Sequence, residues 1–280
     1  MKRVLLLVDL SYQTYRAAAA NRHLTSEGRF TGGLYGFMMA LGKAARETGA
    51  TRAAFCRDTK PYVRSRQYPE YKQIRKKAAD PELRELMLES EEYVLAALER
   101  LGHAPLAEPG FESDDIIADL SLSERHRFDE IYAMSNDSDL FQLLWVPNLA
   151  LYNEGIKKCA RGASLTCPEG KPITPADYML ATALMGTHND IAGIPQVGKT
   201  RAFAAVRDAA KLRKMRADNA EIVERNLALI KLPHDEFPGA RLPPPPAFRA
   251  QDLYAEMGRY DIETTAAMVA AFEAIGRRPR

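Results

Sequence analysis

Apolar runs alternate with amphipathic segments along the first half of the chain. Four short apolar runs, bounded by polar or turn residues, predict buried β-strands. They occupy residues 4–10, 51–58, 129–137 and 149–153. Between them, apolar residues recur every three or four positions, which predicts helices at 33–47, 81–101 and 114–124. Strands that alternate with helices form a mostly parallel central sheet with helices on its faces, so we expect an α/β fold.

The second half of the chain follows a helical pattern from residue 174 onward. Thr174 is expected to cap a helix that has Pro175 at its first position and ends at Gly186. After a glycine-rich stretch, the spacing of Ala, Val and Leu predicts a second amphipathic helix over 201–215. The order helix, glycine-rich hairpin, helix is therefore expected here.

A proline-rich connection, FPGARLPPPPAF at 237–248, interrupts the helical pattern and is expected to be extended and semi-rigid. It leads to a last amphipathic helix near 262–276. We therefore divide the chain into an α/β core over 1–173, which includes a basic segment at about 57–90, and a helical part over 174–280.

The composition excludes several classes of protein. With 280 residues, of which 46% are hydrophobic, the chain can bury a substantial core and is not disordered. It has no run of about twenty apolar residues, and its apolar start is too short for a secretory signal. We therefore expect a cytoplasmic protein without membrane contact. Cys56, Cys159 and Cys167 form no CxxC pair, which indicates neither a disulfide framework nor a zinc site.

The small net charge of +2 hides two basic segments. Residues 57–77 contain eight Lys and Arg against two acids, and residues 199–216 contain seven against one, so each segment carries +6. The rest of the chain must then carry −10. Two basic segments on an acidic body are typical of a surface that binds a polyanion, although a solvated helix face gives the same pattern.

The stretch GIPQVGKT at 193–200 matches the phosphate-binding P-loop pattern, with Gly193, Gly198, Lys199 and Thr200 in the defining positions. A P-loop follows a buried strand, because the strand aims backbone N–H groups at the phosphates. Here a helix precedes it instead. Free N–H groups at the start of the second helix would still favour an anion, including a nucleic-acid backbone. An ordinary turn between helices and a nucleotide hydrolase are the alternatives.

Acidic residues gather where the expected strands end, and in a parallel sheet those ends share one edge. The set comprises Asp9, Asp58, Glu112, Asp114, Asp115, Asp137 and Asp139. Ser113 is placed to cap a helix that has Asp114 and Asp115 in its first turn. Each acid alone can have a purely structural function, either as an N-cap or in a first helical turn, where the helix dipole favours negative charge. Seven anions at one edge, however, repel one another unless cations neutralise them.

A site rich in carboxylates, without His or Cys, suits Mg²⁺ or Mn²⁺. Two such ions close together promote in-line displacement at a phosphodiester, because one activates the attacking water and the other stabilises the leaving oxygen. The acids therefore predict a two-metal site for phosphodiester hydrolysis.

Five segments carry further patterns in a fixed order. They are VDLSYQTYRAAAA (8–20), RDTKPYVRSRQYPEYKQIRKK (57–77), FESDDIIADL (111–120), SNDSDLFQLL (135–144) and ALMGTHNDIAGIPQVGKTRA (183–202). In that order they resemble the opening strand, the basic arch, the E-x-D-D segment, the D-x-D segment and the helix–three-turn–helix of the 5′ nuclease family. This family includes the flap endonucleases and 5′–3′ exonucleases of bacterial DNA polymerase I and of phages. The resemblance covers about residues 4–206 and implies a PIN-like core.

The resemblance also implies what each matching residue does. Asp9, Asp58, Glu112, Asp114 and Asp115 would hold or orient a first metal ion, and Asp137 and Asp139 would serve the second ion or both. Arg16, Lys72 and Arg75 would steady the scissile phosphate. Tyr71 would stack on an unpaired base, with a half-buried structural aromatic as the alternative. DNA contacts would come from Arg64, Arg66, Lys76 and Lys77 in the arch, and from Gly193, Gly198, Lys199 and Thr200 in the hairpin.

One segment departs from the family pattern. The family shows M-G-D-x-x-D-N-I where this chain has MGTHNDI, which is one residue shorter. Thr187 takes the place of the first acid, and Asp190 or Asn189 takes that of the second. Asp190 is the candidate metal ligand, and the second ion would be held more weakly or through waters. His188 is either a substitute ligand or a surface residue.

We therefore expect a Mg²⁺-dependent, structure-selective 5′ nuclease that acts as a monomer on DNA with 5′ ends, flaps or branches. Two Mg²⁺ ions are the expected cofactors, with Mn²⁺ as a substitute and K⁺ at the helix–three-turn–helix as a further candidate. No polymerase-sized segment follows, so a stand-alone enzyme of a bacterial cell or a phage-infected host is expected. The alternatives are a DNA-binding protein that has lost cleavage through the change at Thr187, and a P-loop NTPase.

Overall fold

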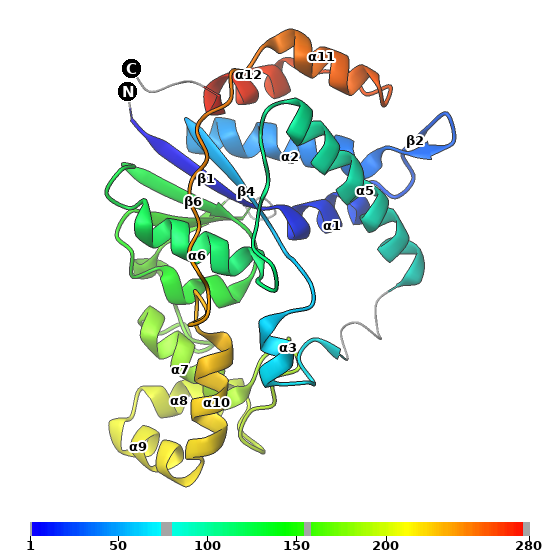
Figure 1. Cartoon of the computed structure of the whole chain (residues 1–280). Helices are drawn as coiled ribbons and strands as arrows, with labels where there is room; N and C mark the ends of the chain where they lie inside the picture. The colour runs from blue at the N-terminus through cyan, green and yellow to red at the C-terminus, as the bar shows by residue number, and fades with distance from the viewer. Residues whose placement is uncertain (1, 74–79, 154–157, 277–280) are drawn as a thin grey trace.

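The chain folds around a mostly parallel sheet, as the sequence predicts. The computed structural model describes residues 2–73, 80–153 and 158–276, without the side chains of residues 158 and 159. Its main sheet has the order β5-β4-β1-β6-β7-β8, and each pair of neighbours is parallel except β7 with β8. The strands are β1 (Val4–Asp9), β4 (Arg52–Arg57), β5 (Leu106–Ala107), β6 (Glu130–Met134), β7 (Leu149–Asn153) and β8 (Lys158–Ala160). Figure 1 shows helices on both faces of this sheet.

Both faces of the sheet are buried because side chains alternate along each strand. In β1, Leu6 and Val8 join one core cluster, and Leu5 and Leu7 join the other. The first cluster is completed by α1 (Leu10–Ala20), α2 (Gly32–Thr48), α5 (Pro81–Arg100), α11 (Ala250–Gly258) and α12 (Ala266–Ile275). The second contains α6 (Ser113–Ser123), the 3₁₀ helix η1 (Ser138–Leu143) and the helical part of the chain up to residue 242. The carboxyl end of β1 is therefore fixed between two packed layers.

The helical part begins with α7 (Pro175–Met185), which Thr174 caps and Gly186 ends, as predicted. The prediction of one helix over 201–215 is wrong. The structure has α8 (Lys199–Val206) and α9 (Ala209–Asp218), because Asp208 accepts hydrogen bonds from the N–H groups of residues 210 and 211 and starts a new helix. A further helix, α10 (Ala220–Ile230), packs against α7.

Several small elements escape the sequence pattern. They are the hairpin β2 (Thr25–Ser26) and β3 (Arg29–Phe30), the short helix α3 (Val63–Gln67) and the 3₁₀ turn η2 (Gly162–Ser164). The last helix was expected near 262–276 but begins at Ala266, where Thr265 caps it, and α11 precedes it. No helix among the described residues is long and apolar enough to cross a membrane.

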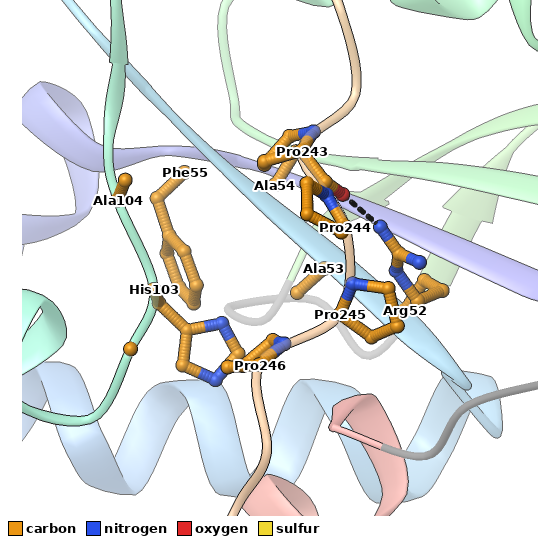
Figure 2. Close-up of a pocket in the computed structure, with 11 residues that line it drawn as sticks. Arg52, Ala53, Ala54, Phe55, His103, Ala104, Pro243, Pro244, Pro245 and Pro246 are labelled. Atoms are coloured by element: carbon orange, nitrogen blue, oxygen red, sulfur yellow. Dashed lines mark hydrogen bonds between the residues drawn. The ribbon is translucent and has the colours of Figure 1, made fainter.

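The proline-rich segment is extended, as predicted, and covers an edge of the sheet. Strand β5 pairs only with Cys56 and Arg57 of β4, so residues 52–55 have no strand beside them on that side. Figure 2 shows residues 243–246 lying there, with the Arg52 guanidinium donating to the Pro243 carbonyl. Prolines lack an N–H and cannot extend the sheet, so they close this edge without inviting another strand. In Figure 1 the orange segment runs from α10 along the sheet to α11.

Candidate metal and nucleic-acid site

Three acids meet at the carboxyl edge of the sheet, as the strand pattern predicts. Strands β4, β1 and β6 are neighbours. Asp9 is the last residue of β1, Asp58 follows β4, and Asp137 lies three positions beyond the end of β6. The predicted strand 129–137 ends earlier, at Met134, and Asp137 instead caps η1. Carboxylates therefore line the carboxyl edge of the sheet, which is where parallel α/β folds bind their ligands.

Asp9 is the most thoroughly buried of these three acids, with 4% of its surface exposed. It accepts hydrogen bonds from the Tyr12 N–H at 3.1 Å and from the hydroxyls of Ser113 and Ser135 at 2.9 Å each. Burial raises the pKa of Asp9 to about 7, and the neighbouring Asp58 carboxylate adds to that shift. The sequence does not predict that Ser113 and Ser135 bond to Asp9. It shows only that each serine lies next to an acidic motif.

Asp58 and Asp114 both lie at the start of α6. Asp58 accepts from the Ser113 N–H at 2.8 Å and from the Tyr62 hydroxyl at 3.0 Å. The Asp114 Oδ1 atom is buried and finds no hydrogen-bond partner among the residues that the structure describes. Burial raises the pKa of Asp114 well above its usual range, and the charges of Asp137 and Asp9 raise it further. An unpartnered buried acceptor among like charges is a place that a cation would stabilise.

Glu112 begins α6 and is held by cations. It occupies the N-cap position, so the prediction that Ser113 caps this helix is wrong; Asp114 and Asp115 do lie in the first turn. The Arg64 guanidinium and the Tyr71 hydroxyl donate to Glu112 Oε2 at 3.0 and 2.8 Å. Burial acts to raise the pKa of Glu112, but the nearby cations outweigh it and the pKa is lowered. Glu112 is therefore ionised and already neutralised within the protein.

Asp115 and Arg64 form a buried pair behind the site. The guanidinium donates to both carboxylate oxygens of Asp115, at 2.7 and 2.8 Å, and also to the carbonyls of Leu229 and Lys231. Asp115 further accepts from the His234 N–H at 2.8 Å. With Asp115 completely buried and Arg64 3% exposed, neither faces solvent. The expectation that Arg64 contacts DNA is therefore wrong. Of the two functions expected for Asp115, orienting the residues around the ion fits these contacts and holding the ion directly does not.

Lys72 reaches into the acidic cluster from the basic arch. Its ammonium group contacts Glu112 and lies 5.2 and 5.4 Å from the ring centroids of Tyr62 and Tyr71. Burial lowers the pKa of Lys72, but Glu112 and Asp58 raise it by more, so the group stays charged. Tyr71 is 4% exposed and bonded to Glu112. It is therefore a buried structural aromatic, and the expectation of base stacking by Tyr71 is not supported.

The second pair of predicted metal ligands lies at η1. Asp137 Oδ1 accepts from the Asp139 N–H at 2.9 Å, and Asp137 Oδ2 lies 3.8 Å from Nε2 of His188. Burial raises the pKa of Asp139 to about 7, and Asp137 adds to the effect. The side-chain amide of Asn189 donates to Asp139 Oδ2 at 3.2 Å. The sequence left open whether Asp190 or Asn189 takes the place of the family's second acid, and this contact places Asn189 beside Asp139.

The helix–three-turn–helix is closed by glycines and supported by α10. At Gly193 a Cβ atom would lie 2.2 Å from the Met185 carbonyl carbon, so only glycine fits this close approach. The buried Asn226 of α10 donates to the carbonyls of Ala183 and Ala192, at 2.8 and 3.0 Å. Gly198 precedes α8, and Lys199 and Thr200 form its first exposed positions. A helix and a hairpin lead into this stretch, as predicted, which is not the strand context of a P-loop.

The remaining predicted contacts fall into two groups. Arg66 is exposed on α3, and Arg16 is half-buried on α1. Arg75, Lys76 and Lys77 lie outside the described residues. The described part of the arch therefore offers Lys72 at the carboxylates and Arg66 on the surface.

The residues present fit a divalent cation, although they are not gathered as a finished cage. In the described part of the chain, no three Asp, Glu, His or Cys side chains lie ready to hold one ion. Mg²⁺ takes only one or two carboxylates directly and keeps several waters. Asp114, with its unpartnered oxygen, and Asp9 and Asp58 beside it supply that kind of site. The fit is weaker around Asp139, where an amide and not an acid approaches.

Comparison with known proteins assigns the family. The sequence model of the family described as "5′-3′ exonuclease, N-terminal resolvase-like domain" matches residues 4–166. The chain belongs to this 5′ nuclease family. DNA polymerase I of Mycobacterium bovis is 31% identical over 228 residues, which cover 79% of this chain and 25% of that protein. DNA polymerase I of Thermus thermophilus is 30% identical over 216 residues, covering 75% and 24%. The chain thus spans about a quarter of the length of these curated relatives.

Solved structures share the fold. The T5 5′-exonuclease with bound zinc aligns over 98% of both chains, with a TM-score of 0.68 and 18% identity. The flap endonuclease-1 of Methanococcus jannaschii aligns over 98% of this chain and 92% of its own, with a TM-score of 0.56 and 13% identity. At these identities the likeness shows the architecture, which is the PIN-like 5′ nuclease fold that the sequence resemblance implies.

Proposed function

We propose that this chain is a Mg²⁺-dependent, structure-selective 5′ nuclease that hydrolyses phosphodiesters in DNA with 5′ ends, flaps or branches. The observation that carries the proposal is the cluster of desolvated carboxylates at one sheet edge. Asp9, Asp114 and Asp139 have raised pKa values because burial and neighbouring acids destabilise their charges. A protein gains nothing in stability from such a cluster unless it binds cations.

The carboxylates divide into two groups around the candidate ions. Asp9, Asp58 and Asp114 would hold the first, and Asp137 and Asp139 would hold the second through waters. Bound divalent ions supply Lewis-acid stabilisation of the phosphate oxygens and lower the pKa of a water. The chain's own contribution includes the hydroxyls of Ser113 and Ser135, which fix the orientation of Asp9.

Lys72 is the cation that the chain itself offers to the reacting phosphate. Its ammonium group is held among Glu112, Tyr62 and Tyr71, beside the carboxylates. A fixed positive charge in a site that excludes water stabilises the charge that builds up on the phosphate oxygens in the transition state. Glu112 keeps the group charged and prevents it from turning away.

The duplex part of the substrate would be held by the hairpin and α8. Lys199 and Thr200 are exposed in the first turn of α8, and Lys199 brings one positive charge to the start of this helix. A helix N-terminus favours a phosphate there without reading the base sequence. This arrangement supports selection of DNA by shape.

A cleavage assay tests the proposal directly. A 5′-labelled flap substrate should release its 5′ fragment with Mg²⁺, and chelation by EDTA should stop the reaction. Asp114→Asn combined with Asp137→Asn should lower the rate by at least 10³-fold, since both changes remove charge from the place of the ions. Cleavage that survives the chelator or this double variant would refute the metal-dependent mechanism.

A DNA-binding protein without cleavage is the second candidate, and the approach of Asn189 to Asp139 favours it. An amide in place of an acid removes one negative charge from the second ion's site. This function predicts salt-dependent binding to branched DNA and no product at any Mg²⁺ or Mn²⁺ concentration. The same flap substrate distinguishes the two functions.

A further inference from the structure

Asn189 connects three parts of the molecule that are far apart in the sequence. It lies in the turn between α7 and α8 and is 3% exposed. Its own N–H donates to Thr187 Oγ1 at 3.0 Å, within the turn. Its carbonyl accepts from the Lys72 N–H at 2.9 Å, and its side-chain amide donates to Asp139 Oδ2 at 3.2 Å. One buried residue thus contacts the hairpin, the arch and a carboxylate of the site.

The backbone contact acts on Lys72. The Lys72 φ angle is 56°, in the left-handed region that a residue with a side chain occupies only when its surroundings hold it there. The bond from the Lys72 N–H to the Asn189 carbonyl is one such restraint. Because the ammonium group follows the backbone, the place of the positive charge beside Glu112 depends on where the turn holds Asn189.

The side-chain contact acts on Asp139. An ionised carboxylate only accepts hydrogen bonds, so the amide must present its NH₂ group to Asp139. A pocket of about 10 Å³, roughly the room that one water needs, lies between these two residues and Glu112 and Asp114. The amide therefore fixes the orientation of the Asp139 carboxylate, which lines this pocket.

We propose that Asn189 is a positioning residue: it holds Asp139 through its side chain and Lys72 through its carbonyl, and so couples the grip of the hairpin on duplex DNA to the site. The inference rests on the proposed nuclease function and deepens it. An aspartate of the same size would lack the donor and would repel Asp139. Asparagine lets the carboxylate be oriented without a cation between the two side chains.

The test compares Asn189→Ala and Asn189→Asp with Asn226→Ala as a matched control. Asn226 supports the same turn but bonds to the Ala183 and Ala192 carbonyls. We expect Asn189→Ala to lower kcat on a saturating flap substrate by about 10- to 100-fold. Its Kd for the same DNA, measured without divalent ions, should stay within twofold of wild type. Asn226→Ala should weaken DNA binding and lower kcat together, because it loosens the turn that carries Asn189.

Asn189→Asp gives a signature that loss of turn structure does not. Without its donor, this variant should lose the orientation of Asp139 and lower kcat as Asn189→Ala does, but its added carboxylate should lower the Mg²⁺ concentration needed for half-maximal rate. A kcat within twofold of wild type for Asn189→Ala, or a loss of kcat and DNA affinity together as in Asn226→Ala, would overturn the inference.

Calorimetric titration with Mn²⁺ provides a readout that does not depend on cleavage. Asn189→Ala should bind Mn²⁺ several-fold more weakly than wild type, because Asp139 is no longer oriented. If wild type fails to cleave DNA, the proposed function fails, and the positioning of Asp139 is judged by this titration alone. Mn²⁺ affinities unchanged in both Asn189 variants would then refute it.

Discussion

Arg64 and Asp115 form a two-pronged ion pair inside the protein, with N–O distances of 2.7 and 2.8 Å. The pair joins α3 at the foot of the arch to α6, and Arg64 also bonds the carbonyl of Leu229 at the end of α10. Three segments that bring residues to the site thus meet at one guanidinium.

Arg64→Ala is expected to destabilise the fold by about 3–5 kcal/mol, because it leaves the buried Asp115 charge without its partner. Chemical denaturation monitored by circular dichroism measures the loss. The exposed Arg66→Ala, two positions away, is the control and should change stability by less than about 0.5 kcal/mol. A small loss at Arg64 together with weakened DNA binding would instead mean that Arg64 contacts DNA.

Lys72→Ala is expected to lower kcat by about 100-fold or more, because it removes a fixed charge beside the carboxylates. DNA binding without divalent ions should change little, since the ammonium group is already paired with Glu112 and the side chain is only 21% exposed. Kinetics on a flap substrate separate kcat from KM. Lys60→Ala is the matched control, because the Lys60 ammonium lies 5.8 Å from the Tyr62 ring centroid. Equal effects of both substitutions would contradict a specific function of Lys72.

Stability without metal should fall as the pH rises. The pKa values of Asp9 and Asp139 are raised from 3.8 to about 7, so the folded chain keeps protons that the unfolded chain releases from about pH 4 upward. The contribution of these two groups to the free energy of unfolding is therefore fully present below pH 4 and is lost as the pH rises through 7. Mg²⁺ should offset that loss.

Thermal melts in EDTA and in Mg²⁺ measure this effect. We expect Mg²⁺ to raise Tm by several degrees at pH 8 and by much less at pH 5.5, where protons already neutralise the acids. Asp114→Asn should reduce the shift at pH 8. A Tm shift of the same size at both pH values would show that the ions bind elsewhere.

The sequence predicts where the acidic residues gather better than it predicts which side chains of the basic segment are buried. Asp9 and Asp58 could be placed because each ends a strongly apolar strand and parallel strands end at one edge. The sequence predicts Arg64 at the DNA surface, and Tyr71 either there or as a half-buried structural aromatic, because a basic segment shows its charge in the sequence but not which side chains turn inward. Their burial depends on Asp115 and Glu112, which lie about 40 to 50 residues away.

Local signals explain two further differences. Asp208 is a good N-cap residue in the middle of an Ala- and Lys-rich stretch, so the break between α8 and α9 has a local signal in the sequence, which the continuous apolar periodicity of the stretch obscures. The contact of Asn189 with Asp139 had no such signal. It depends on how a turn one residue shorter than the family pattern folds, and α10, a later segment, fixes that turn.

His103 should make the fold sensitive to acid. Its ring lies 5.4 Å from the Phe55 ring and 5.5 Å from the Phe272 ring, and burial lowers its pKa from 6.5 to about 4. The unfolded chain binds the proton first, so this contribution is complete above pH 6.5 and is lost as the pH falls to about 4. The loss should be at most about 3 kcal/mol. Denaturation of wild type and His103→Phe at pH 7 and pH 4.5 measures it, and an equal pH dependence of both proteins would contradict it.

Substitution of Lys199 distinguishes a DNA-binding function of the hairpin from a nucleotide-binding one. If the hairpin holds a DNA phosphate, Lys199→Ala should weaken binding to branched DNA and reduce the slope of log K against log salt by about 0.9, the change for one lost phosphate contact. Lys2→Ala is the control, because Lys2 lies just before β1, at the amino end of its strand, and pairs with Glu130. ATP should not compete with the DNA, since α8 follows a helix and hairpin and not a strand. Tight ATP binding that Lys199→Ala abolishes would restore the nucleotide hydrolase.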